Sequence, residues 1–483
     1  MQFHAYVRLL GGLLGYGLFA ASVQANEPAQ VAPLVIENLR MLDPAVGDED
    51  VEARGTLVIV DGRIAYAGEQ AAAPEIHGAV VIDATGLTAT PGLVDMHVHV
   101  WDETELAAYL AAGITTVRNM SGMPFHLDLA RRIEAGELAG PRLETTGPIL
   151  NSPGPNAQIN HQMVTTADEA RAAVAAQQDA GYTRLKTYSN LTRAAYDAML
   201  DEAHRRGMRV TGHTPEGERL DGMPFERDFL IGFAEILDDG FETIEHTESI
   251  VWHGLRENFD PAAGRLLAER IAASGSAVTP TLVAHRNLVR VARTKGQFAQ
   301  RPGMDKLNPV TQSLEAENIA VWAARDPSYG ERAGAFYARF TGMMHDAGVL
   351  LVAGSDAGIF TNIPGESLFD EFDLLAESGL APLDILRTGT ANPAIVLGRE
   401  GTSGCLATGC EADLVFYACD PLAKIDCLRR PQAVVRAGRW LDRAALDALD
   451  EAATRHDPQR TITNLAAGMA AQGTPLDPSV LGQ

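Results

Sequence analysis

Short apolar runs recur through the middle of the chain, separated by Ala-rich stretches with the spacing of amphipathic helices. Runs of this length predict buried strands, and their alternation with helices predicts βαβ units on a parallel sheet. Between residues 93 and 400 the runs are LVDMHVHV, ITTVRNM, RLETTGPIL, RLKTY, MRVTGHT, ETIEHT, SAVTPTL and VLLVAGSDAG. Eight strand–helix units over about 300 residues predict a (β/α)8 barrel.

The pattern changes at both ends of the chain. Residues 33–92 and the residues after 400 contain short β-rich runs separated by turn signals, such as Asp61-Gly62. We therefore expect an α/β protein in which both ends join into a small β-sandwich domain. The predicted division is a signal peptide (1–25), the first part of the sandwich (26–92), the barrel (93–400), the second part of the sandwich (401–445) and a C-terminal helical tail (446–483).

The first 25 residues have the composition of a secretory signal peptide. One basic residue, Arg8, precedes the apolar run LLGGLLGYGLFAAS, and Val23 and Ala25 occupy the small-residue positions of a cleavage site. This run is shorter than the roughly 20 residues of a membrane-spanning helix. We therefore expect cleavage after Ala25 and a periplasmic or secreted protein without a membrane anchor.

The charge and the cysteines refine this picture. A formal net charge of −24 argues against nucleic acid and anionic membranes as partners.

The sequence has four cysteines: Cys405, Cys410, Cys419 and Cys427. They contain no C-x-x-C pair, which favours disulfides over a zinc site in an exported protein. Three pairings are open. Turn signals within GCLATGC and ACDPLAKIDC favour the two local bridges, 405–410 and 419–427.

Ionisable residues stand at the C-terminal ends of five predicted strands, where barrel enzymes carry their active sites. They are His97, His99, Lys186, His213, His246 and Asp356. His97 and His99 are two residues apart, so on a strand they point to the same face. Imidazole and carboxylate are good ligands for Zn²⁺ and similar ions, and packing alone gives no reason for this coincidence. The pattern predicts a metal centre.

The segment PGLVDMHVHV, followed by Lys, two His and GSDAG, resembles the amidohydrolase superfamily. The segments GPRLETTGPIL, TGTANPAIVLG and GCLATGCEADLVFYACDPL are similar to its imidazolonepropionase-like and prolidase-like branch. The resemblance covers nearly all of residues 33–440 and implies a barrel with a small β-sandwich. It also implies a binuclear centre in which His97 and His99 bind the buried metal and His213 and His246 hold the second.

In the resemblance, Lys186 occupies the position of the carboxylated lysine of binuclear members. Reaction with CO₂ would turn its amine into a carbamate whose two oxygens can bridge two ions. Asp356 would bind the first metal, contact the bridging hydroxide and act as general acid/base. The implied cofactors are therefore two divalent metal ions, with zinc expected, and a CO₂-derived carbamate on Lys186.

The implied reaction is hydrolysis of an amide or peptide C–N bond in a small molecule. Dipeptides of the Xaa-Pro kind or N-acyl amino acids are the expected substrates. A lactonase or cyclic-amide hydrolase using the same metals is the alternative, and so is an exported binding protein that has lost catalysis, although the intact ligand set argues against the latter. A homo-oligomer is compatible with the sequence.

Three residues are candidates for contacts with the substrate. Tyr188, near Lys186 on the same strand face, is a candidate catalytic group that would hydrogen-bond the carbonyl or its oxyanion; a packed core tyrosine is the other interpretation. His161, in a Gly/Pro-rich loop, and Arg118, at the end of the second strand, are candidates for binding the substrate. We expect long specificity loops at 215–232 and 283–345.

Overall fold

The computed structural model describes residues 32–48 and 50–474. The predicted signal peptide lies outside the described residues. Within the described ranges, no helix has the length and apolar character needed to cross a membrane.

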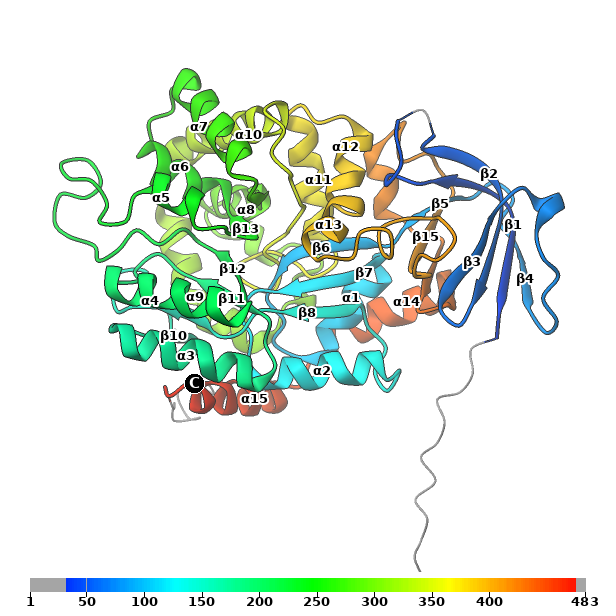
Figure 1. The fold of residues 1–483 in the computed structure, drawn as a ribbon, viewed down its shortest axis with the longest axis horizontal. Coiled ribbons are helices and arrows are strands. Elements are labelled where there is room, and N and C mark those ends of the chain that lie inside the picture. Colours follow the sequence, from blue (N-terminus) through cyan, green and yellow to red (C-terminus); the bar gives the residue numbers. More distant parts are fainter. Residues whose placement is uncertain (1–31, 49, 475–483) are drawn as a thin grey trace, which may run out of the picture. The chain divides into compact units, whose positions relative to one another are not determined.

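Strands from both ends of the chain form one sheet (Figure 1), with the order β17-β16-β15-β5-β1-β2-β3 and β4 paired to β1. They are β1 (Leu34–Leu42), β2 (Glu52–Val60), β3 (Arg63–Gly68), β4 (Val80–Asp83), β5 (Thr88–Pro91), β15 (Leu414–Tyr417), β16 (Ala433–Arg436) and β17 (Arg439–Asp442). Asp61 and Gly62 connect β2 to β3, both with positive φ, as a two-residue type I′ hairpin requires. The union of the two chain ends in one sheet agrees with the sequence pattern.

The middle of the chain forms parallel strands, in the orders β6-β7-β8 and β10-β9-β11-β12-β13-β14. They are β6 (Leu93–Val98), β7 (Ile114–Asn119), β8 (Arg142–Thr145), β9 (Ile149–Asn151), β10 (His161–Met163), β11 (Arg184–Thr187), β12 (Arg209–Gly212), β13 (Thr243–Glu245) and β14 (Ala277–Thr279). The predicted third run is divided between β8 and β9.

The predicted eighth strand is reduced to two isolated parallel bridges, from Leu351 to Val278 and from Ala357 to Val98. The segment nevertheless accepts backbone hydrogen bonds from both neighbouring strands. Val278 N of β14 donates to Leu350 O (3.0 Å), and Met96 N of β6 donates to Ala353 O (2.9 Å). The ladder is interrupted between the two bridges, where Ala353 N donates to Thr388 O instead of to a neighbouring strand.

Helices separate the parallel strands and cover them. They are α1 (Leu106–Ala111), α2 (Pro124–Glu134), α3 (Ala167–Ala180), α4 (Arg193–Arg206), α5 (Phe233–Asp238), α6 (Thr247–Leu255), α7 (Pro261–Ser274), α8 (Leu282–Arg293), α9 (Pro309–Ala324), α10 (Pro327–Asp346), α11 (Ser367–Glu377), α12 (Pro382–Thr388) and α13 (Ala391–Val396). Short 3₁₀ turns occur at Gln70–Ala72, Glu103–Glu105, Gln297–Gln300, Met304–Lys306 and Ile425–Arg429. The start of α3 illustrates the local signals: Thr166 and Glu169 form a capping box.

The expectation of a long loop at 283–345 is wrong, because most of this stretch is helical. The helices α8, α9 and α10 occupy it. The side chains of Asn308 and Asp326 accept hydrogen bonds from the second residue of α9 and α10, and a proline follows each cap. A capping residue followed by proline is a helix-start signal, and it occurs twice in this stretch, at Asn308-Pro309 and Asp326-Pro327.

The stretch 215–232 contains no helix or strand, as expected for a loop. His253, a buried residue of α6, contacts both of its ends. Its Nδ1 lies 2.7 Å from Thr214 Oγ1, and its Nε2 lies 2.8 Å from Ile231 O. One imidazole therefore fastens the base of this loop to the helix that follows β13.

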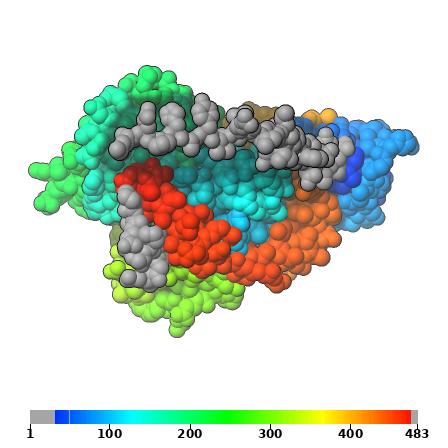
Figure 2. All heavy atoms as spheres, turned by 90° about the horizontal axis from the view of Figure 1, so that it is seen from below, coloured from blue at the N-terminus to red at the C-terminus, as the bar shows by residue number. Residues whose placement is uncertain are grey.

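Two further helices follow the last strand: α14 (Arg443–Ala452), which begins before residue 446, and α15 (Pro458–Ala471). Helix α15 lies beside α2 on the face that Figure 2 shows. Arg460 of α15 bonds both carboxylate oxygens of the buried Asp102. Leu465 packs in the same cluster as Trp101, which follows the HVH segment by two residues. The tail is thus joined to the region beside β6.

Both predicted local disulfides, Cys405–Cys410 and Cys419–Cys427, are present in the structure. On the chain-entropy estimate, loops this short give each bridge less than about 3 kcal/mol of stabilisation. We expect reduction to lower the melting temperature and leave the metal content unchanged, because none of these cysteines contacts the histidine cluster described below. Calorimetry and metal analysis before and after reduction and alkylation check this, and loss of metal on reduction would contradict it.

Glu371 of α11 is a buried carboxyl whose Oε2 accepts a hydrogen bond from Val283 N (2.8 Å). Burial raises its pKa from about 4.5 to about 8. Between about pH 4.5 and pH 8 the folded protein therefore keeps a proton on Glu371 that the unfolded chain has released. The free energy of unfolding consequently falls as pH rises through this range, by up to about 1.4 kcal/mol per pH unit.

Glu371→Gln removes this titration. We expect the melting temperature of this variant minus that of wild type to become larger as pH rises from 5 to 8, because only the wild type loses stability through this carboxyl. The control is Glu377→Gln, which changes an exposed carboxylate on the same helix and should show a difference that does not vary with pH. Parallel curves for wild type and Glu371→Gln would contradict the assignment.

Candidate metal centre

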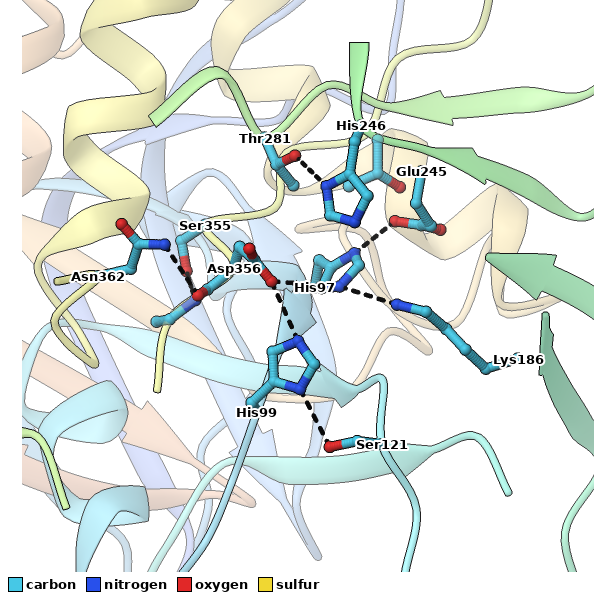
Figure 3. Close-up of polar contacts among 12 residues, drawn as sticks. His97, His99, Ser121, Lys186, Glu245, His246, Thr281, Ser355, Asp356 and Asn362 are labelled. Carbon is cyan, nitrogen blue, oxygen red and sulfur yellow. Dashed lines mark hydrogen bonds and ion pairs between the residues drawn. The ribbon is translucent and has the colours of Figure 1, made fainter. Parts of the chain in front are cut away.

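Three of the predicted ligands meet at one point (Figure 3). His99 Nε2 lies 3.0 Å from Asp356 Oδ1, and His97 Nε2 lies 3.4 Å from the same oxygen. One ligand atom from each of these residues falls within 4.8 Å of the others, and all three side chains are buried. His97 belongs to β6, His99 follows it, and Asp356 lies beyond the bridge at Leu351. This group is a candidate cation site.

The other three predicted ligands lie next to this group. Lys186 Nζ, from β11, lies 3.1 Å from His97 Nε2. The ring of His246, just after β13, is 4.6 Å from the ring of His97, and the ring of His213, after β12, is 4.4 Å from that of His246. An unmodified lysine amine carries no carboxylate oxygen and, when protonated, no lone pair with which to bind a cation.

The hydrogen bonds of two imidazoles leave one nitrogen available for a cation. His97 Nδ1 lies 2.6 Å from Glu245 Oε2, so Nδ1 donates to the carboxylate and Nε2 keeps a lone pair. His246 Nδ1 lies 2.6 Å from Thr281 Oγ1, a hydroxyl that itself donates to Pro280 O. The Nε2 atom of His246 is therefore unprotonated as well. The two unprotonated Nε2 atoms are therefore suited to bind a metal ion.

Burial also keeps these imidazoles in the form that ligates metals. It lowers the pKa of His246 to about 4 and the pKa of His97 and His213 well below the usual value. All three are therefore neutral near pH 7. The buried Nδ1 of His213 has no hydrogen-bond partner among the described residues. Burial likewise lowers the pKa of Lys186, to about 8.

The backbone places Asp356 against His99. Asp356 has φ = +53°, a left-handed conformation that Asp and Asn tolerate better than most residues. Its N–H donates to His97 O (2.8 Å), and Asn362 Nδ2 donates to its carbonyl (3.1 Å). Gly358 lies so close to the same strand end that a Cβ there would stand 1.8 Å from His99 O. The loop is thus held to the end of β6 from both sides.

Two of the candidate substrate contacts lie beside the cluster. The ring of Tyr188 is 4.0 Å from His213 and 4.5 Å from His161. His161 Nδ1 faces two donors, Asn151 Nδ2 at 3.1 Å and Gln158 N at 3.3 Å. The ring proton of the neutral His161 therefore sits on Nε2, which is buried and has no hydrogen-bond partner in the described part of the chain.

Arg118 does not lie on an accessible surface. It is fully buried on β7, where Nε donates to Met96 O (2.8 Å) and Nη2 donates to Glu245 Oε1 (2.9 Å). These contacts favour a role beneath the site over contact with the substrate. Sequence reasoning missed Glu245 itself. An acidic residue inside the apolar run TIEHT was the available signal, because a buried carboxylate needs partners.

An α/β fold with a buried His-His-Asp group at strand ends is typical of a metal-dependent hydrolase. A profile of the amidohydrolase family matches residues 88–441. The chain belongs to this family.

Relatives and solved structures are similar to this chain over most of its length. An uncharacterized protein of Mycobacterium tuberculosis is 26% identical over 418 residues, which cover 79% of this chain and 91% of that protein. The structure of bottromycin amidohydrolase aligns with 92% of each chain at 26% identity, with a TM-score of 0.68. A Xaa-Pro dipeptidase with methionine bound in its active site aligns with 85% of this chain and 100% of its own at 20% identity, with a TM-score of 0.64, which supports the fold alone.

Proposed function

We propose that this protein is an exported, binuclear metal-dependent amidohydrolase that cleaves an amide or peptide C–N bond. Its expected substrates are Xaa-Pro-like dipeptides or N-acyl amino acids. The observation that carries the proposal is the buried group His97, His99 and Asp356, with the amine of Lys186 only 3.1 Å from His97 Nε2. The 26% identity to bottromycin amidohydrolase supports hydrolysis of an amide bond as the reaction.

The proposed scaffold is a (β/α)8 barrel over residues 93–400, with a β-sandwich made of 26–92 and 401–445. The parallel pairing from β11 to β14 supports it. So do the backbone hydrogen bonds that join residues 350–353 to both β14 and β6. The two disulfides support export to an oxidising compartment.

In the proposed centre His97, His99 and Asp356 would hold one ion, and His213 and His246 the other, with carboxylated Lys186 between them. When bound, such ions generate hydroxide from water near neutral pH and polarise a carbonyl oxygen. Asp356 would receive the proton of the attacking water and deliver it to the leaving nitrogen.

The remaining residues of the chain would bind and orient the substrate. His161 Nε2–H has no hydrogen-bond partner within residues 32–48 and 50–474, so it would donate a hydrogen bond to a substrate oxygen. Tyr188 packs against both His161 and His213, which brings its side chain between the predicted substrate contact and the proposed centre. Its hydroxyl would donate to the scissile carbonyl.

Two measurements test the function together. Plasma emission on protein purified without chelator should give two divalent ions per chain. A hydrolysis screen over Xaa-amino-acid dipeptides, N-acyl amino acids, lactones and cyclic amides should then find turnover with the first two classes. Turnover confined to lactones or cyclic amides would overturn the substrate class, and a firm ratio of one ion per chain would overturn the binuclear centre.

A further inference from the structure

Glu245 is a fully buried carboxylate that faces four side-chain donors, three of which lie on other strands. His97 Nδ1 lies 2.6 Å from Oε2, and Arg118 Nη2 lies 2.9 Å from Oε1. The hydroxyls of Thr211, at 3.0 Å, and Thr243 donate to the same Oε1. One oxygen therefore serves His97 alone, while the other receives the remaining donors.

Arg118 is the only one of these donors that carries a permanent charge. It is fully buried, and its Nε donates to the carbonyl of Met96, the residue before His97. The Arg118 guanidinium therefore donates hydrogen bonds both to the backbone of β6 next to His97 and to the carboxylate that bonds His97. A buried charge without a partner is costly, so the pair constrains the position of each member.

We propose that Arg118 and Glu245 are positioning residues that fix His97 as the Nδ1–H tautomer and thereby present Nε2 to the metal. Neither residue belongs to the group whose atoms would bind the cation. Glu245 acts through His97, and Arg118 acts through Glu245 and the Met96 carbonyl. The inference rests on the proposed function only in requiring that His97 binds a metal ion.

The principal test is metal affinity, measured by chelator competition on folded protein with Zn²⁺ as the probe. Glu245→Gln gives Arg118 and His97 one acceptor oxygen to share and adds an amide donor. We expect its Zn²⁺ affinity to fall by about 10- to 100-fold, the usual effect of removing a carboxylate partner from a ligating histidine. Glu245→Asp keeps the charge but shortens the reach, and a similar loss is expected.

The matched control is Glu242→Gln. Glu242 is partly buried, with its side chain 8% exposed, and pairs with Arg184 (2.8 Å) and Arg209. It lies 3.6 Å from Arg118 Nη1 and makes no hydrogen bond or ion pair with His97. Its Zn²⁺ affinity should equal that of wild type even where its melting temperature falls. Equal affinity losses in the Glu242 and Glu245 variants would indicate a general packing effect and overturn the inference.

A direct readout uses the wild-type protein without metal. Ring-nitrogen NMR of ¹⁵N-histidine-labelled protein, with the His97 signals assigned by a His97→Asn variant, should show the Nδ1–H tautomer. Observation of Nε2–H at His97 would overturn the inference whether or not the Glu245 variants fold. If wild type binds no Zn²⁺, the proposed function and this inference both fail; if it binds Zn²⁺ and Glu245→Gln binds it equally well, only the inference fails.

Discussion

Asp356→Asn is expected to lower turnover by about 10²- to 10⁴-fold, the span typical for loss of a general acid–base group. Asparagine is isosteric with aspartate and tolerates the positive φ of this position, so the loop after β14 should keep its conformation. The change removes the carboxylate that faces His99 and His97 and would carry the proton. Steady-state kinetics on the best substrate from the screen measure the effect.

A suitable control is Asp413→Asn, which alters an ion pair with Arg436 in the eight-stranded sheet. Its turnover should stay within about twofold of wild type. Wild-type turnover by Asp356→Asn would show that another group transfers the proton. Metal analysis of the same sample separates loss of the acid–base group from loss of an ion.

Lys186→Ala is expected to abolish most activity and to reduce the metal content below two ions per chain. Lys186 is buried, with its amine beside His97 Nε2, and the proposed carbamate on it would supply both bridging oxygens. The substitution leaves a space that a short carboxylic acid can occupy, so added formate or acetate should restore part of the activity. Plasma emission and kinetics with and without the acid test this.

Lys306→Ala is the matched control, because Lys306 pairs with Glu366 and Asp450 and touches none of the proposed ligands. It should retain wild-type metal content. Two tightly bound ions in Lys186→Ala would contradict the bridging role.

Much of the fold could be predicted because its signals are local. Apolar runs alternating with helical stretches indicated parallel strands, and turn signals indicated the hairpins of the chain ends. The candidate ligands followed from the same reasoning, since side chains two residues apart on a strand share a face, as with His97 and His99. The helices at 283–345 also had local signals, in Asn308-Pro309 and Asp326-Pro327, so that error was one of interpretation.

The remaining features depend on contacts between residues far apart in the chain. The sequence by itself determined which ionisable residues end the strands, because alternation along a strand is a property of neighbouring residues. Only the tertiary structure decided that Arg118 lies beneath the site, 127 positions from its partner Glu245, and that Glu245 meets His97 across 148 positions. Such pairings arise when separate strands are brought side by side, and no local pattern specifies which buried charge will meet which.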